Sequence, residues 1–205
     1  MIDFYTANSS NGQRAAIMIE ECGLPYKLHK LDLFGGEQRR PEFLTINPAG
    51  TIPAIVDHEG PGRTPLMLAQ SGAILLYLAM KTGRFFPPDP ALRAHAFQWT
   101  MQATTDVAAS SMSLFLLQRF VPDRSEANDA WFEDRIIGQL RVADARLKGR
   151  KYLAGDVSIA DFALYPLTVV RKPLIERAGD LCELERWAAS MAARPAVERA
   201  MRAAA

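Results

Sequence analysis

The first part of the chain carries short apolar segments separated by turn residues, a pattern typical of small strands and helices packed together. Apolar side chains recur at helical spacing in residues 12–22, whereas they alternate in residues 26–33 with a change of phase at His29. The turn-rich residues 58–62 separate two short apolar segments and predict an antiparallel hairpin. The predicted elements are strands at 2–5, 26–33, 54–57 and 66–69, and helices at 12–22, 41–46 and 71–81. Their order predicts a thioredoxin-like α/β domain, a mixed sheet covered by helices.

The texture of the sequence changes at residues 83–90, where a glycine and three prolines prevent a helix from continuing. We expect a domain boundary there, with a first domain at residues 1–82 and residues 83–90 as the linker. Residues 91–205 are rich in Ala, Leu, Met and Arg and contain no convincing strand. They predict an all-α C-terminal helical bundle.

Composition and charge exclude several classes of function. Apolar residues make up 49% and charged residues 23% of the 205 residues, as in soluble globular proteins. A net charge of +1 is too small to attract nucleic acid. No apolar run approaches the roughly 20 residues that cross a bilayer, and no secretory signal is visible. Cys22 and Cys182 lie far apart without metal-site spacing, so we expect a cytoplasmic protein without a structural metal.

Pro53 stands at the entrance of a predicted inner strand, where the loss of a backbone N–H donor is costly. One explanation is a cis Ile52-Pro53 bond, which would leave the backbone N–H and C=O of Ile52 free to pair with a peptide-like ligand. The alternative is an ordinary trans loop proline, and spacing alone leaves both open.

Two predicted helix starts carry small polar residues that could bind an anion. Ser71 follows Gln70 at a strand-to-helix junction and is predicted to be an N-cap. The loop that contains Ser9 and Asn11 leads into the first helix, where donors could stabilise a thiolate. At both positions the alternative is simple capping. No cysteine lies in this loop, so any reactive sulfur there must belong to a ligand.

Several other conspicuous residues are interpreted as structural. Ser158 and Asp161 have the spacing of a capping box, and Tyr5 alternates toward one face of its strand as a half-buried aromatic residue. The three histidines His29, His58 and His95 show no spacing that would build a metal site. The large apolar residues of the second half could line a pocket but are interpreted mainly as core: Trp99, Met101, Met112, Phe115 and Phe120.

Four groups of residues, in this order and spacing, resemble the glutathione S-transferase superfamily over essentially the whole chain. They are Pro41-Glu42-Phe43-Leu44 with Asn47-Pro48; Ile52-Pro53; Gln70-Ser71 with Ala73-Ile74 and Tyr77-Leu78; and Ser158-Ile159-Ala160-Asp161. The opening Met1-Ile2-Asp3 with Ser9-Ser10-Asn11-Gly12 looks most like the bacterial nu class. The resemblance implies the glutathione S-transferase fold, a homodimer, and glutathione as the co-substrate without a metal.

The resemblance also implies roles for individual residues. Pro53 should be cis, the backbone of Ile52 should pair with the cysteinyl part of glutathione, and Gln70 with Ser71 should hold its γ-glutamyl group. Ser9 and Asn11 should face the glutathione sulfur, Gln38 should contact the ligand, and Arg135 should contact a second glutathione. Two departures from the nu pattern are Ser9-Ser10 in place of Thr-Pro and Gln70 in place of an acidic residue.

The leading hypothesis for function is a glutathione-dependent disulfide oxidoreductase, in which Asn11 and Ser9 stabilise the thiolate of bound glutathione. A second hypothesis is a transferase that conjugates glutathione to small electrophiles. A third is a non-catalytic, glutathione-binding regulatory protein.

Overall fold

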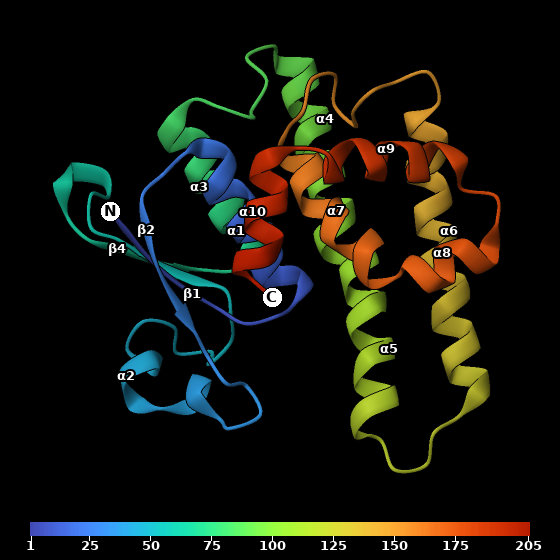
Figure 1. Cartoon of the computed structure of the whole chain (residues 1–205), viewed down its shortest axis with the longest axis horizontal. Coiled ribbons are helices and arrows are strands. Elements are labelled where there is room, and N and C mark those ends of the chain that lie inside the picture. Colours follow the sequence, from blue (N-terminus) through green and yellow to red (C-terminus); the bar gives the residue numbers. More distant parts are fainter. The chain divides into compact units, whose positions relative to one another are not determined.

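The computed structural model describes residues 1–205, and the chain forms two compact units (Figure 1). The first unit comprises Met1–Arg84 together with Ala192–Ala205, and the second comprises Phe85–Met191. Residues 192–205 therefore group with the sheet, whereas the predicted division assigned them to the helical part. The predicted domain limits, 1–82, 83–90 and 91–205, otherwise remain a prediction. No helix is long and apolar enough to cross a bilayer.

The first unit contains a four-stranded mixed sheet in the order β2-β1-β3-β4. Strand β1 is parallel to β2 and antiparallel to β3, which forms the predicted hairpin with β4. The strands are β1 (Ile2–Thr6), β2 (Tyr26–Lys30), β3 (Ala54–Asp57) and β4 (Leu66–Ala69). Strand β2 ends earlier than predicted, because Asp32 accepts hydrogen bonds from the backbone of Phe34 and Gly35 and turns the chain.

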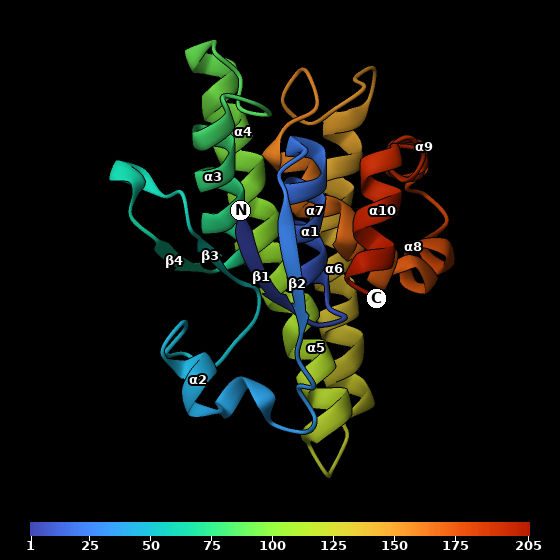
Figure 2. The same cartoon turned by 60° about the vertical axis from the view of Figure 1, so that its left-hand side comes forward.

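Helices α1 and α3 lie next to one another beside this sheet, as Figures 1 and 2 show. Alternation along β1 buries Ile2, Phe4 and Thr6 and leaves Asp3 and Tyr5 on the other face. The helices of the unit are α1 (Ser10–Cys22), α2 (Pro41–Leu44), α3 (Ser71–Thr82) and α10 (Pro195–Ala203), with short 3-10 turns at Glu37–Arg39 and Pro61–Arg63.

The C-terminal helix α10 packs against α1. Arg194 forms an ion pair with the buried carboxylate of Glu21, and Arg199 forms another with Glu20. Ala204, beyond the helix end, is 1% exposed. Val197 and Ala200 are the buried residues of α10, and this apolar face explains why the last residues group with the first unit, since a short helix gains most of its stability from the face that it buries.

The second unit is helical, as predicted. It contains α4 (Pro90–Met101), the π-helix η3 (Gln102–Val107), α5 (Ala108–Phe120), α6 (Glu126–Leu147), α7 (Ile159–Val170), α8 (Lys172–Ala178) and α9 (Cys182–Ala192). Helices α5 and α6 pack against one another, and α4 packs against α7 (Figure 1).

The predicted capping box starts helix α7. The Ser158 hydroxyl accepts a hydrogen bond from the backbone N–H of Ala160, and the Asp161 carboxylate accepts one from the backbone N–H of Ser158. Asp161 is fully buried and also accepts hydrogen bonds from Leu153 N–H and Trp187 Nε1–H. Burial nevertheless raises the pKa of Asp161 to about 6.

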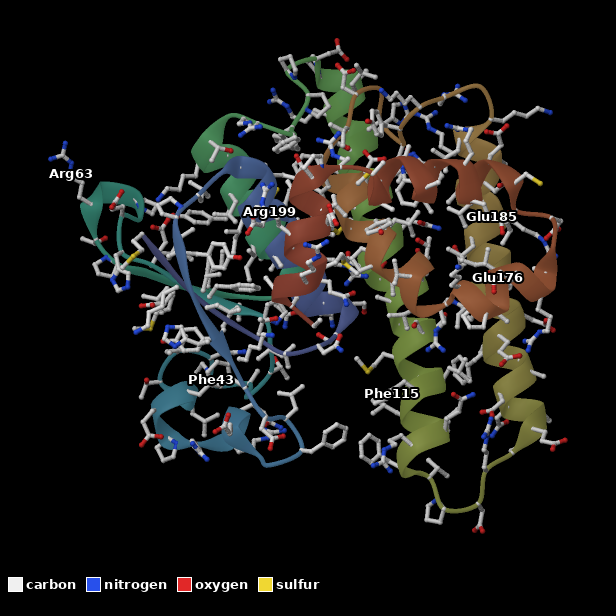
Figure 3. All side chains as sticks on the ribbon, in the orientation of Figure 1. Phe43, Arg63, Phe115, Glu176, Glu185 and Arg199 are labelled. Atoms are coloured by element: carbon white, nitrogen blue, oxygen red, sulfur yellow. The ribbon has the colours of Figure 1, made fainter.

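One expectation about the helical core was wrong. Trp99 is buried, but Met101, Met112, Phe115 and Phe120 are all exposed. Figure 3 shows the Phe115 side chain extending away from the axis of α5. Composition could not distinguish these positions, because a Met or Phe on a helix is counted as apolar whichever face it occupies.

Candidate functional site

The predicted ligand-binding segments of the first unit leave the sheet at one end. Ala54 pairs with Tyr5 of β1 and with Ala69 of β4. The residues after β1, before β3 and after β4 therefore lie around the same edge of the sheet. Strand β2 runs parallel to β1, so its loop starts there too. The sheet thus brings together the segments that carry Ser9 and Asn11, Ile52 and Pro53, and Gln70 and Ser71.

Helix α1 begins at this edge with Ser9 as its N-cap. The Ser9 Oγ accepts a hydrogen bond of 3.1 Å from the backbone N–H of Gly12, which leaves the hydroxyl proton available for another acceptor. Only glycine fits at residue 12, because an added Cβ would lie 2.2 Å from Thr6 Oγ1 and 2.7 Å from the carbonyl oxygen of Ala7. The predicted thiolate site therefore coincides with a capped helix N-terminus.

Arg14 connects this helix start with the next one. Its guanidinium donates to Asn11 Oδ1 at 2.5 Å and to Ser71 Oγ at 3.4 Å. The residue is 1% exposed, and burial lowers its pKa to about 10, so it remains protonated at neutral pH. A buried cation thus lies between Asn11 and Ser71.

Helix α3 begins differently from the prediction. Gln70, not Ser71, occupies the N-cap position, and the Gln70 side chain makes no capping hydrogen bond. Ser71 is already helical, and its hydroxyl oxygen accepts from Arg14. Gln70 has φ 72° and ψ 118°, a backbone conformation that costs a non-glycine residue energy and is concentrated at ligand-binding sites. Its exposed side chain is positioned by this conformation.

The Ile52-Pro53 peptide bond is cis, as the resemblance implied. Pro53 is buried and precedes β3, while Ile52 is half-buried. The hydrogen bonds of the chain use neither the backbone N–H nor the C=O of Ile52. Both groups can therefore pair with an extended peptide-like ligand.

Gln38 lies in the 3-10 turn that follows β2 and its loop. Its Nε2 donates to the carbonyl oxygen of Leu33 at 3.0 Å, whereas its Oε1 is buried without a partner. A Cβ added at Gly50, two residues before Ile52, would lie 3.0 Å from the Gln38 carbonyl oxygen. Gln38 is therefore next to the segment that leads to the cis bond.

Arg135 lies in the second unit, on α6. Its guanidinium Nε donates to Ser110 Oγ at 3.2 Å, and its Cζ lies 5.7 Å from the centroid of the Trp131 ring. The first unit alone holds the other predicted site residues.

The electrostatics of the first-unit site favour an anion. Neither α1 nor α3 has an acidic residue in its first turn. The unpaired N–H groups at a helix start carry partial positive charge, and buried Arg14 adds a full one. Ser9 and Ser71 each accept a hydrogen bond from inside the protein, so both hydroxyl protons remain available for another acceptor. The arrangement suits a ligand that carries carboxylate and thiolate groups.

The residues interpreted as structural lie outside this constellation. Tyr5 stacks on His29, and burial raises the pKa of its phenol. Asp3 pairs with both His29 and His58, and no group of three or more His, Cys, Asp or Glu residues could hold a metal ion. Burial raises the pKa of the Cys22 thiol, which disfavours a reactive thiolate there.

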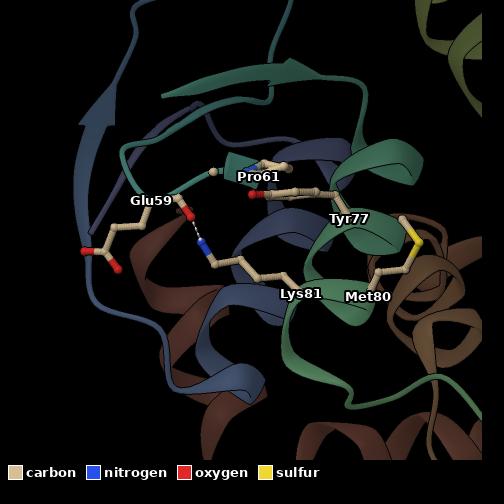
Figure 4. A pocket seen from close by; sticks show the side chains of 6 residues that line it. Glu59, Pro61, Tyr77, Met80 and Lys81 are labelled. Carbon is tan, nitrogen blue, oxygen red and sulfur yellow. Dashed lines mark hydrogen bonds between the residues drawn. The ribbon is translucent and has the colours of Figure 1, made fainter. Parts of the chain in front are cut away.

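A surface pocket of about 400 Å³ also lies in the first unit (Figure 4). Its polar groups are already paired: the Lys81 ammonium binds Asp57 and the carbonyl oxygen of Glu59, and the Tyr77 hydroxyl donates to Asp57. None of the predicted site residues lines it, so we do not assign the ligand site there. The lining residues are Glu59, Gly60, Pro61, Tyr77, Met80 and Lys81.

The sequence-based site omitted Arg14. A signal was present, because Arg14 stands one helical turn before Met18 on the apolar stripe of α1, where a charged side chain needs buried partners. Those partners could not be identified from spacing alone, since Ser71 is 57 positions away.

Comparisons with known proteins agree with this architecture. The family model for the glutathione S-transferase N-terminal domain matches residues 8–81, and that for the C-terminal domain matches residues 105–195. Disulfide-bond oxidoreductase YfcG of Escherichia coli is 38% identical over 168 residues, which cover 81% of this chain and 78% of that protein. Disulfide-bond oxidoreductase YghU of the same organism is 31% identical over 97% of this chain and 73% of its own length.

Among solved structures, a Pseudomonas putida glutathione transferase with one glutathione disulfide per subunit superposes with a TM-score of 0.92. It is 32% identical, over 98% of this chain and 90% of that chain. A Burkholderia graminis glutathione transferase with two glutathione molecules per subunit has a TM-score of 0.88 and 37% identity, over 98% and 87% of the two chains. By its two matched domains, its relatives and its sheet-and-bundle architecture, the chain belongs to the glutathione S-transferase family.

Proposed function

We propose that this chain is a glutathione-dependent disulfide oxidoreductase. The observation that carries the proposal is the set of hydrogen-bond donors at one edge of the sheet, around two helix N-termini without acidic residues. The names of the two Escherichia coli relatives and the glutathione disulfide bound to the Pseudomonas putida protein support this reaction class.

Glutathione would bind along this edge in an extended conformation. Its γ-glutamyl carboxylate would accept hydrogen bonds at the start of α3 from Ser71, with Gln70 beside its amino group. Its cysteinyl backbone would pair with Ile52 ahead of cis Pro53. Its sulfur would face Ser9 and Asn11 at the start of α1, with Gln38 contacting the rest of the tripeptide.

The chemistry requires two glutathione molecules and no protein cysteine. The bound glutathione thiolate attacks one sulfur of a substrate disulfide, forming a mixed disulfide and releasing the other substrate sulfur as a thiolate. A second glutathione thiolate then attacks the glutathione sulfur of the mixed disulfide. This step yields glutathione disulfide and releases the remaining substrate thiolate. The protein lowers the pKa of the first thiol and holds the two sulfurs in line.

Asn11 and Ser9 are the residues that the proposal assigns to the thiolate. Replacing Asn11 by Ala should raise the pKa of bound glutathione by about one unit, because a hydrogen bond to a charged group is worth about 1.5–3 kcal/mol. Reduction of a small glutathione mixed disulfide should then fall about tenfold at pH 6.5. The matched control is Ser10→Ala, at the neighbouring helix position. A wild-type rate equal to that in buffer would remove the proposal.

A second candidate function is conjugation of glutathione to a small electrophile. Its support is the exposed apolar surface of α5, formed by Met112, Phe115 and Phe120. An assay of glutathione conjugation to an aromatic halide distinguishes the reductase from the transferase. A reductase without transferase activity would leave the conjugation rate equal to that in buffer. Glutathione binding by calorimetry without turnover in either assay would instead identify a non-catalytic binding protein.

We assign the chain to the nu class, place Arg135 at a second glutathione, and propose a homodimer in the cytoplasm. Calorimetry gives the number of glutathione molecules per chain, and Arg135→Ala should reduce it from two to one. Light scattering of the purified protein gives the oligomeric state.

A further inference from the structure

Arg14 contacts the side chains that lie at both ends of the proposed glutathione site. Its guanidinium donates to Asn11 Oδ1 on α1 and to Ser71 Oγ at the start of α3. Arg14 is among the largest side chains in the chain that are less than 2% exposed. It therefore lies beneath the site and cannot contact solvent freely.

The direction of these hydrogen bonds determines which atoms Asn11 and Ser71 present to a ligand. A guanidinium has five N–H donors and no acceptor, so the atom facing it must be an acceptor. The Asn11 amide therefore turns its oxygen toward Arg14, and its Nδ2 amino group is the end that is left for a ligand. Ser71 likewise uses a lone pair toward Arg14 and keeps its hydroxyl proton available.

A thiolate or carboxylate accepts hydrogen bonds, so a reversed Asn11 amide would present a repelling oxygen in place of a donor. The oxygen and amino ends of an asparagine amide have nearly the same shape, so packing alone does not fix which end faces a ligand. The contact with Arg14 removes that freedom before the ligand arrives, which is the preorganisation that electrostatic stabilisation requires.

Arg14 is the charged group that contacts both Asn11 and Ser71, although the loop after β2, which starts at the same edge, also carries charged side chains, among them Arg39. Glu20 and Glu21 lie at the other end of α1, where Glu20 pairs with Arg199 of α10 and Glu21 pairs with Arg194, the residue before that helix. At the far end of α3, Lys81 pairs with Asp57. The first turns of both helices contain no acidic residue.

We propose that Arg14 is a positioning residue, which fixes the Asn11 amide and the Ser71 hydroxyl as donors and so sets the pKa of the bound glutathione thiol. This inference rests on the proposed function, because the thiol belongs to glutathione. It adds a residue that does not touch the ligand but controls the two that do.

The test is a pH titration of enzyme-bound glutathione, followed by the ultraviolet absorbance of the thiolate. Arg14→Met removes the donors, and the thiol pKa should rise by about one unit. At pH values below the thiol pKa of the wild-type complex, the reductase rate of the variant should be about tenfold lower than that of the wild type. At high pH the two rates should become similar. Arg14→Lys keeps the positive charge and N–H donors, so its thiol pKa should lie close to the wild-type value.

The matched control is Arg194→Met, which removes another partly buried arginine of the first unit from its contact with Glu21. It should lower stability without moving the thiol pKa. In an Asn11→Ala background, Arg14→Met should raise the pKa by less than half as much, since the amide that it orients is gone. Equal shifts in both backgrounds would overturn the positioning role.

The outcomes separate the two proposals. If wild-type protein does not bind glutathione in calorimetry, the proposed function fails. If it binds and Arg14→Met leaves the thiol pKa unchanged while Asn11→Ala raises it, only the present inference fails. If Arg14→Met does not fold, Arg14→Gln replaces it, because a single amide cannot donate to both Asn11 and Ser71. A thiol pKa equal to that of the wild type in this variant would likewise contradict the positioning role of Arg14.

Discussion

The buried Asp161 carboxylate predicts an unusual pH dependence of stability. It accepts hydrogen bonds from Leu153 N–H at 3.1 Å, Ser158 N–H at 2.9 Å and Trp187 Nε1–H at 2.9 Å. Burial raises its pKa from 3.8 to about 6, while these hydrogen bonds oppose the increase. The folded state therefore binds a proton more tightly than the unfolded state does.

The sign follows from this difference in proton affinity. Because the folded pKa is the higher one, the stability contribution of Asp161 is fully present below pH 3.8 and is lost as the pH rises through about 6. The change from 3.8 to about 6 corresponds to about 3 kcal/mol. Asp3 and Asp57 have lowered pKa values and give the opposite dependence, so the Asp161 contribution must be isolated by subtraction.

The perturbation that isolates it is Asp161→Asn, which removes the titration and keeps one acceptor oxygen. Urea unfolding followed by tryptophan fluorescence gives the free energy of unfolding of both proteins between pH 4 and 7. The wild-type value minus the variant value should fall by about 2–3 kcal/mol over this range. Asp156→Asn, in the exposed part of the same loop, is the control. A difference that is constant or grows with pH would show that hydrogen bonding outweighs burial.

Two further predictions concern the candidate site. Gly12→Ala should weaken glutathione binding more than tenfold and lower the melting temperature, because the added Cβ would overlap Thr6 Oγ1 and the Ala7 carbonyl oxygen. Calorimetry measures the affinity and thermal unfolding measures the melting temperature. A wild-type affinity would contradict the close approach at Gly12. The double variant Cys22→Ser, Cys182→Ser should have a disulfide reductase rate within about twofold of the wild-type rate, because the reacting sulfurs belong to glutathione. A rate reduced to that in buffer would instead identify a protein thiol as the nucleophile.

Much of the fold could be predicted locally. The β3–β4 hairpin has the predicted limits, because two short apolar segments on either side of a turn leave little freedom in register. The capping box at Ser158 and Asp161 was also visible, since both partners lie within one helical turn. Helix α10 groups with the first unit through contacts with α1 that span more than 170 positions, which local patterns could not indicate.

Local sequence patterns were enough to predict which residue types surround the candidate site, because these residues stand at the ends of predicted elements: Ser9, Asn11, Ile52, Pro53, Gln70 and Ser71. Their orientation depends on long-range packing. Spacing suggested that Ser71 caps its helix, but Gln70 occupies the cap position and Ser71 bonds Arg14. A helix cap depends on residues within one turn, which local sequence shows. The partners of a buried charge come from segments that are distant in sequence and meet only when the chain folds.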